Sequence, residues 1–145
     1  MSRDGNDDDR PAIFSAIGPE QCVQLLTEHS IGRVAWQAAE GPQILPVTYA
    51  WFEGTVAFRT SPYGVLSELM RPTEVAFEVD EFDEDHHHGW SVVVHGRAQT
   101  VAEPSELIRM WTISGVVPWA SGIRNLFIQI TPHRLTGRRV VAGAG

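Results

Sequence analysis

Apolar and polar residues alternate along much of this chain, and a two-residue period is typical of β-strands that bury one face. Within residues 73–82, for example, Val75, Phe77 and Val79 alternate with acidic and small residues, so that one face is apolar and the other carries acids. About six strands are predicted, at residues 32–38, 43–52, 55–60, 73–82 and 90–102, and in 123–141 as a final strand pair bent at Pro132.

Three short helices are predicted beside these strands, at residues 18–32, 61–72 and 103–113, each with a proline near one end. The strands follow one another mostly through tight connections such as Glu53–Gly54, which favour antiparallel hairpins. We therefore predict a mainly β fold, an antiparallel β-barrel with short helices, since closing the barrel removes exposed strand edges.

Composition narrows the possible partners and compartments. The net charge is -7, and an acidic chain is a poor binder of nucleic acid. No apolar run reaches the length of a membrane span, and the single cysteine, Cys22, fits a reducing cytoplasm. We expect residues 1–12 to be a disordered acidic tail rather than a secretion signal, residues 13–141 to be one domain, and residues 142–145 to be a flexible C-terminus.

Several short stretches of the sequence, in their order along the chain, resemble the corresponding stretches of the FMN-binding split-barrel family. Within that family they are most similar to small actinobacterial members named after pyridoxamine 5'-phosphate oxidase. The stretches run from about Gln21 to Arg139 and include "LLTEHSIGRVAW", "ILPVTYAW", "VAFRTSPYG", "EVAFEVDEFD", "GWSVVVHGRA", "VPWASG" and "ITPHRLTGRR". The resemblance implies a six-stranded antiparallel split barrel that forms a homodimer with two cofactor sites at its interface. Family members bind FMN, a deazaflavin coenzyme or heme, and some have no demonstrated cofactor.

The resemblance places the cofactor phosphate at the junction after the third strand. Arg59 and Thr60 match the family pattern there, whereas Gly64 and Val65 stand where serine and lysine are usual. Arg59 can offer a bidentate guanidinium and Thr60 a hydroxyl, and Gly64 lets the backbone approach an anion closely. The outward-pointing amides at the start of the following helix are expected to add further donors. The alternative is that this stretch only turns the chain and caps a helix.

The resemblance places the cofactor ring beside "LPVT", where the backbone at Pro46, Val47 and Thr48 would run along the ring edge. A proline within a strand also fits an ordinary edge strand, so that alternative stays open.

Trp90 and Ser91 match family positions near the ring and phosphate, and Trp119 matches a tryptophan that the second subunit contributes. An indole offers a flat surface and one N–H donor to a planar heterocycle, although these tryptophans could equally fill the dimer interface.

Other polar residues are expected to play no catalytic role. His86, His87 and His88 lie in a predicted loop, where adjacent histidines rarely converge, so we predict a solvated tip and no metal site. Arg97 shares a strand face with His95 and could reach an anionic substrate, but pairing with carboxylates is the simpler expectation.

These residues favour an FMN-dependent oxidoreductase in which hydride moves between the flavin and an unidentified small substrate. A deazaflavin-dependent reductase is the alternative within that class, and heme is the less favoured cofactor. A hypothesis of a different class is a non-catalytic carrier or sensor of flavin or heme. Gly64 and Val65 favour it, because they remove side-chain donors to the phosphate.

Overall fold

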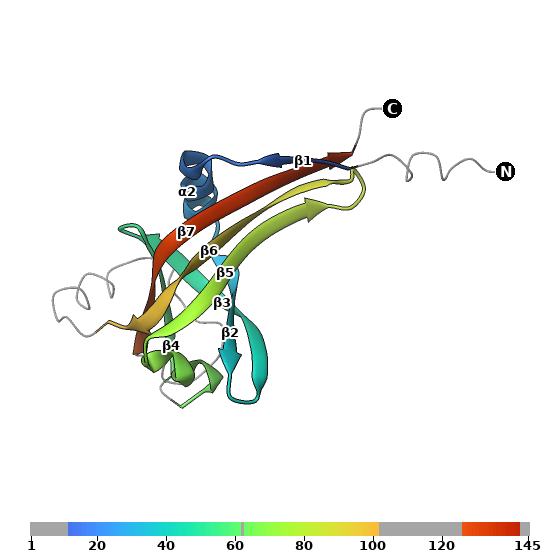
Figure 1. The fold of residues 1–145 in the computed structure, drawn as a ribbon. Helices are drawn as coiled ribbons and strands as arrows, with labels where there is room; N and C mark the ends of the chain where they lie inside the picture. Colours follow the sequence, from blue (N-terminus) through green and yellow to red (C-terminus); the bar gives the residue numbers. More distant parts are fainter. Residues whose placement is uncertain (1–11, 62, 102–125, 143–145) are drawn as a thin grey trace.

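Six antiparallel strands close into a barrel in the computed structural model, which describes residues 12–61, 63–101 and 126–142 (Figure 1). The elements are β1 (Ala12–Ala16), α2 (Pro19–Glu28), β2 (Ile31–Ala38), β3 (Gly41–Phe52), β4 (Thr55–Thr60), the 3₁₀ helix η1 (Val65–Met70), β5 (Thr73–Asp83), β6 (His88–Thr100) and β7 (Leu126–Ala142). The predicted helix at 103–113 lies outside the described residues. Neither helix of the described residues, α2 or η1, is long enough to cross a membrane.

The barrel closes because β7 pairs at both ends of the strand order β7-β4-β3-β2-β5-β6. One edge of β7 carries β6 along most of its length. The other edge carries β4 at residues 126–130 and β1 at residues 138–142. β1 is thus a seventh strand outside the closed ring, and the sequence pattern did not predict it. Ala12 and Ala142, which we expected in the terminal segments, pair with each other at the ends of β1 and β7.

The prediction of a final strand pair was wrong, because β7 is one continuous strand of 17 residues. Its register against β6 shifts at Pro132: His95 pairs with Arg134, whereas Gly96 pairs with Pro132. His133 is therefore the extra residue of a β-bulge, which accommodates a proline that lacks an N–H. A Cβ on Gly96 would lie 2.4 Å from the Thr131 carbonyl oxygen, so only glycine fits this close approach.

The predicted helix at 18–32 is shorter in the structure, because Ile31 already belongs to β2. Cys22 and Leu26 bury the inner face of α2 against the barrel core, and burial raises the pKa of the Cys22 thiol. Two side chains cap the last turn of α2. His29 Nδ1 lies 2.7 Å from the Leu25 carbonyl, and the Tyr49 hydroxyl donates to the Leu26 carbonyl at 2.6 Å. These carbonyls have no partner within the helix, so the barrel fixes the position of its end.

The alternating patterns of the sequence place their apolar side chains in the core, as predicted. In β5, Val75, Phe77 and Val79 are all less than 10% exposed, and Phe77 packs edge-on against Tyr49. The predicted helix at 61–72 is reduced to the single 3₁₀ helix η1.

Candidate functional site

β3 and β4 separate at the residues that the sequence singled out. Their ladder runs from Phe52–Thr55 to Tyr49–Phe58 and stops there. The same register would pair Thr48 with Arg59, but β3 continues along β2 and β4 continues along β7. One edge of each strand therefore lies outside the ladders of the described residues, and the five predicted residues Pro46, Val47, Thr48, Arg59 and Thr60 border this split.

The β3 side of the split has the edge character that its proline predicted. Pro46 is exposed and pairs only with Arg33 of β2 in the described ladders. Val47 is buried, and the Thr48 hydroxyl oxygen is buried without a hydrogen-bond partner among the described residues. A buried hydroxyl without a partner costs free energy, so Thr48 is an unsatisfied polar group at the border of the split.

The β4 side of the split carries a positioned cation. Thr60 is only 3% exposed, which is unusual for a polar residue. The Arg59 guanidinium carbon lies 5.7 Å from the centre of the Phe127 ring, and Phe127 is itself buried. This cation–π contact favours a defined position of the guanidinium over Phe127, the residue that pairs with Arg59 on the β7 edge of β4.

The start of η1 offers less to an anion than the sequence indicated. Gly64 has ordinary backbone angles and open space where a Cβ would stand, so close approach of a ligand is sterically allowed there. Val65 is 54% exposed and adds no donor. The Ser67 amide is already engaged, because it donates to the Gly64 carbonyl at 2.9 Å, so not every amide of this turn points outward as expected.

Trp90 and Ser91 do not lie with the other predicted residues in one chain. On β7, Arg59 pairs with Phe127, whereas Trp90 pairs with Arg139, twelve positions further along. At about 3.3 Å per residue these positions are about 40 Å apart along the strand. Trp90 is buried and packs edge-on against His29, with ring centres 4.9 Å apart. Trp119 lies outside the described residues.

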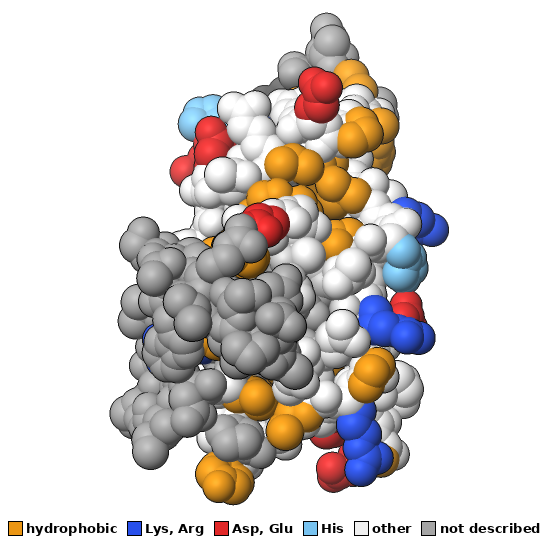
Figure 2. All heavy atoms as spheres, turned by 90° about the vertical axis from the view of Figure 1, so that its left-hand side faces the viewer, with side chains coloured by type: hydrophobic (Ala, Val, Ile, Leu, Met, Phe, Trp, Pro, Cys, Tyr) orange, Lys and Arg blue, Asp and Glu red, His pale blue; other side chains and the backbone are white. Residues whose placement is uncertain are grey.

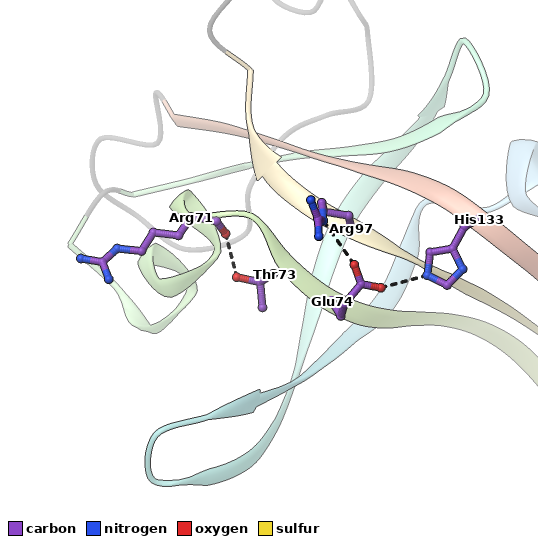
Figure 3. Close-up of polar contacts among 5 residues, drawn as sticks. All are labelled: Arg71, Thr73, Glu74, Arg97 and His133. Atoms are coloured by element: carbon purple, nitrogen blue, oxygen red, sulfur yellow. Dashed lines mark hydrogen bonds and ion pairs between the residues drawn. The ribbon is translucent and has the colours of Figure 1, made fainter.

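Sequence reasoning missed a polar cluster across β5, β6 and β7, which Figure 3 shows. Glu74 accepts hydrogen bonds from Arg97 Nε at 3.3 Å and from His133 Nε2 at 2.9 Å. The His133 hydrogen bond is the main cause that lowers the pKa of Glu74, and Arg97 adds to it. Arg97 is thus paired with a carboxylate, the simpler of its two expected roles. Pro132 in the sequence indicated an irregularity in this strand, and the resulting bulge includes His133. Nothing in the sequence indicated that His133 would contact Glu74.

A second cluster lies at the tip of the β5–β6 hairpin, where we expected a solvated loop. Asp83, His86 and His88 each bring one possible metal-ligand atom within 4.8 Å of the others. His86 lies closest to Asp83, and its hydrogen bond lowers the pKa of that carboxyl group. Two of the three adjacent histidines therefore do converge, although His87 is not part of this cluster.

Comparison with known proteins gives this geometry a context. The family model described as pyridoxamine 5'-phosphate oxidase matches residues 18–139. An uncharacterized protein of Mycobacterium tuberculosis is 32% identical over 128 residues, covering 85% of this chain and 83% of the relative.

Two solved structures are similar over nearly their whole length. The FAD-binding protein from Mycobacterium smegmatis is 28% identical with a TM-score of 0.78, covering 89% of this chain and 100% of that one. A conserved protein of unknown function from Corynebacterium diphtheriae is 29% identical with a TM-score of 0.73, covering 88% of this chain and 98% of that one.

Proposed function

The chain belongs to the pyridoxamine 5'-phosphate oxidase family, and from this membership we propose that it binds a flavin nucleotide and works as a flavin-dependent oxidoreductase. The observation that carries the proposal is the split between β3 and β4, where five residues that the family resemblance selects border one opening in the ladders. The FAD-binding relative from Mycobacterium smegmatis supports a flavin rather than an unrelated ligand.

The residues of the split fit a flavin nucleotide in chemical type. Arg59 would hold the phosphate through its planar guanidinium, and the buried Thr60 hydroxyl would add a second contact. On β3, the backbone at Pro46 and Val47 would follow the ring edge, and the ring would give the Thr48 hydroxyl the partner that it lacks among the described residues.

The phosphate anchor is weaker than the family pattern, since Gly64 and Val65 add no side-chain donor. Losing one charged hydrogen bond costs about 1.5–3 kcal/mol, or about 10- to 100-fold in affinity. We therefore propose FMN as the cofactor, held with reduced affinity, and keep the longer FAD and the deazaflavin coenzyme as alternatives that the titration below separates.

The flavin, when bound, would supply the redox chemistry, accepting or donating a hydride. The chain's own residues would bind the nucleotide, orient its ring and exclude water from the reacting face. The partner in that hydride transfer would be a small molecule, as yet unidentified, and no side-chain acid or base would be needed.

We also propose that two chains form a homodimer and complete each site together. Trp90 and Ser91 lie too far along β7 from Arg59 to serve the same site within one chain, so a second copy would have to bring them there. Figure 2 shows hydrophobic side chains gathered in groups on one face of the molecule. Exposed examples among the described residues include Ile44 at 63% and Val65 at 54%, which is surface that an interface would bury.

Sedimentation equilibrium at several protein concentrations tests the dimer directly. A mass of twice the chain's 16.1 kDa supports it, and a monomer at all concentrations contradicts it.

A fluorescence titration of the purified protein tests the cofactor. FMN, FAD and the deazaflavin coenzyme are each added while tryptophan emission and flavin emission are recorded. Saturable binding of FMN, tighter than that of the other two, supports the proposal. No binding of any of the three contradicts it.

Variants then test the placement of the phosphate. Arg59→Ala should weaken FMN binding about 10- to 100-fold, because it removes the charged donor at the split. Val65→Lys should tighten binding, because it restores a cation at the position where the family carries lysine. The control is Arg134→Ala, which removes an exposed arginine of β7 away from the split and should leave the affinity unchanged. Equal losses for Arg59→Ala and Arg134→Ala would contradict the placement.

Redox turnover separates an enzyme from a carrier. The flavin-loaded protein is reduced with dithionite without oxygen, and its reoxidation by candidate small acceptors is followed by absorbance. Reoxidation that saturates with acceptor supports the oxidoreductase, whereas tight flavin binding without acceptor-dependent reoxidation identifies a carrier or sensor.

A further inference from the structure

The β5–β6 hairpin holds together the three residues of the second cluster. Asp83 and His88 form the last residue pair of the β5–β6 ladder, so the sheet itself places their side chains side by side. Residues 84–87 connect them, and His87 adopts a positive φ of 53° that helps the chain return to β6. His86 reaches back from this turn to Asp83, which defines an Asp83–His86–His88 cluster at the tip.

The donor atoms of this cluster are already close to a shared point. Asp83 Oδ2 lies 2.7 Å from His86 Nδ1 and 3.8 Å from His88 Nε2, and all three lie within 4.8 Å of one another. The two imidazole rings are stacked at 27° with centres 5.9 Å apart. The His86 amide donates to Asp83 Oδ1 at 3.2 Å, which orients the carboxylate and turns Oδ2 toward the rings.

Metal binding would need the donor atoms to move. Tetrahedral bonds of about 2.0–2.1 Å put neighbouring ligand atoms about 3.3 Å apart, so the Asp83–His86 contact at 2.7 Å would open and the Asp83–His88 contact at 3.8 Å would close, each by about 0.5–0.6 Å. The side chain of His86 is 73% exposed, so its ring can shift without displacing packed atoms. The ion would lie between Nδ1 and Oδ2, which are now in direct contact.

The surroundings of the cluster favour a cation. A pocket of about 770 Å³ opens beside it and is lined by Glu81, Glu84 and Asp85 as well as by Asp83 and His88. The lining contains four carboxylates and one arginine, Arg139, so its charge is predominantly negative. Their combined field would attract a divalent ion, and a water molecule or one of the neighbouring carboxylates can fill its remaining positions.

We propose that Asp83, His86 and His88 bind a divalent transition-metal ion, with Zn²⁺ as the first choice, through two imidazole nitrogens and one carboxylate oxygen. Two nitrogens and one oxygen suit Zn²⁺, Ni²⁺ and Cu²⁺, whereas Ca²⁺ and Mg²⁺ prefer ligand sets of oxygen alone. The site would clamp the end of the hairpin, and its test does not require bound flavin.

Calorimetry on the full-length protein without an affinity tag tests the site. Titration with ZnCl₂ in a non-coordinating buffer should show one ion per chain. Asp83→Asn, His86→Asn and His88→Asn should each weaken binding at least tenfold, since loss of even an indirect contact to a metal ligand costs about 10- to 100-fold. His87→Asn is the matched control, because it changes the neighbouring histidine of the same turn and asparagine tolerates a positive φ.

A spectroscopic readout keeps the test informative if the heats are small. Co²⁺ added in place of Zn²⁺ should give visible absorption bands in the wild type and in His87→Asn, but not in the His86→Asn/His88→Asn double variant. Circular dichroism melting checks that the variants, at exposed positions except for the half-buried Asp83, remain folded. Absence of saturable binding in the wild type, or equal weakening by His87→Asn and by His86→Asn, would overturn the proposal.

Discussion

Replacing Thr48 by valine separates two roles of the split between β3 and β4. Valine has nearly the same shape as threonine but lacks the hydroxyl, which is buried without a hydrogen-bond partner among the described residues. In the flavin-free protein this removes an unsatisfied polar group and leaves the packing almost unchanged. The variant should therefore be more stable than the wild type when no flavin is present.

The magnitude follows from the cost of the orphaned hydroxyl. An unsatisfied buried polar group costs about 1–3 kcal/mol, and in a chain of this size 1 kcal/mol shifts the melting temperature by about 3 °C. We expect Thr48→Val to raise the melting temperature by about 3–10 °C. If the flavin ring supplies the missing partner, the same change should weaken FMN binding up to about tenfold, because one hydrogen bond is then lost.

Thr55→Val is the control, because the Thr55 hydroxyl has two partners. It donates to the Phe52 carbonyl at 2.6 Å and accepts from Gln129 Nε2 at 3.0 Å. This variant should lower the melting temperature, so the two threonine-to-valine changes should have opposite signs. Differential scanning calorimetry with and without saturating FMN measures both effects. A Thr48→Val variant that is destabilised as much as Thr55→Val would refute the reasoning, because its hydroxyl would then have a partner within the protein.

Two further predictions test the barrel around the site. Tyr49→Phe removes the hydroxyl that caps the Leu26 carbonyl and should cost about 1–3 kcal/mol in urea unfolding, whereas Tyr63→Phe, at a side chain 93% exposed, should cost almost nothing; equal effects would contradict the capping role. The carboxyl of Glu74 should titrate below its ordinary pKa and contribute stability that is complete above that ordinary value and is lost as the pH falls through the lowered pKa. His133→Ala should raise this pKa in an NMR titration and reduce the acid-dependent loss of stability, and an unchanged midpoint would show that their hydrogen bond is absent in solution.

The candidate site could be predicted in part because each residue's type and strand were visible in the sequence. Pro46 within a strand indicated an edge, and the structure shows Pro46 paired on one side only among the described strands. The resemblance also singled out Arg59 and Thr60, which the structure places at the same split. It could not show that Trp90 lies at the other end of β7, because that depends on which residues of two distant strands face each other.

The histidines at the hairpin tip illustrate the same limit. Three adjacent histidines in a loop carry no spacing that favours a shared ligand, so we predicted a solvated tip and no metal site. The ladder pair Asp83–His88 and the backward reach of His86 create the cluster, and both depend on the exact end of the β5–β6 ladder. One residue of register would turn His88 to the opposite face of the sheet.

By itself, the alternation of apolar and polar residues determined where most strands run and which of their faces are buried, because that pattern is local. Tight connections such as Glu53–Gly54 likewise determined the neighbouring β3–β4 hairpin. Only the tertiary structure decided that β7 closes the barrel on β6 while sharing its other edge between β4 and β1. The closure of the barrel, the split at Thr48 and the cluster at the hairpin tip all depend on pairings between separate strands. The contacts that stabilise them join residues that no single local stretch of sequence contains.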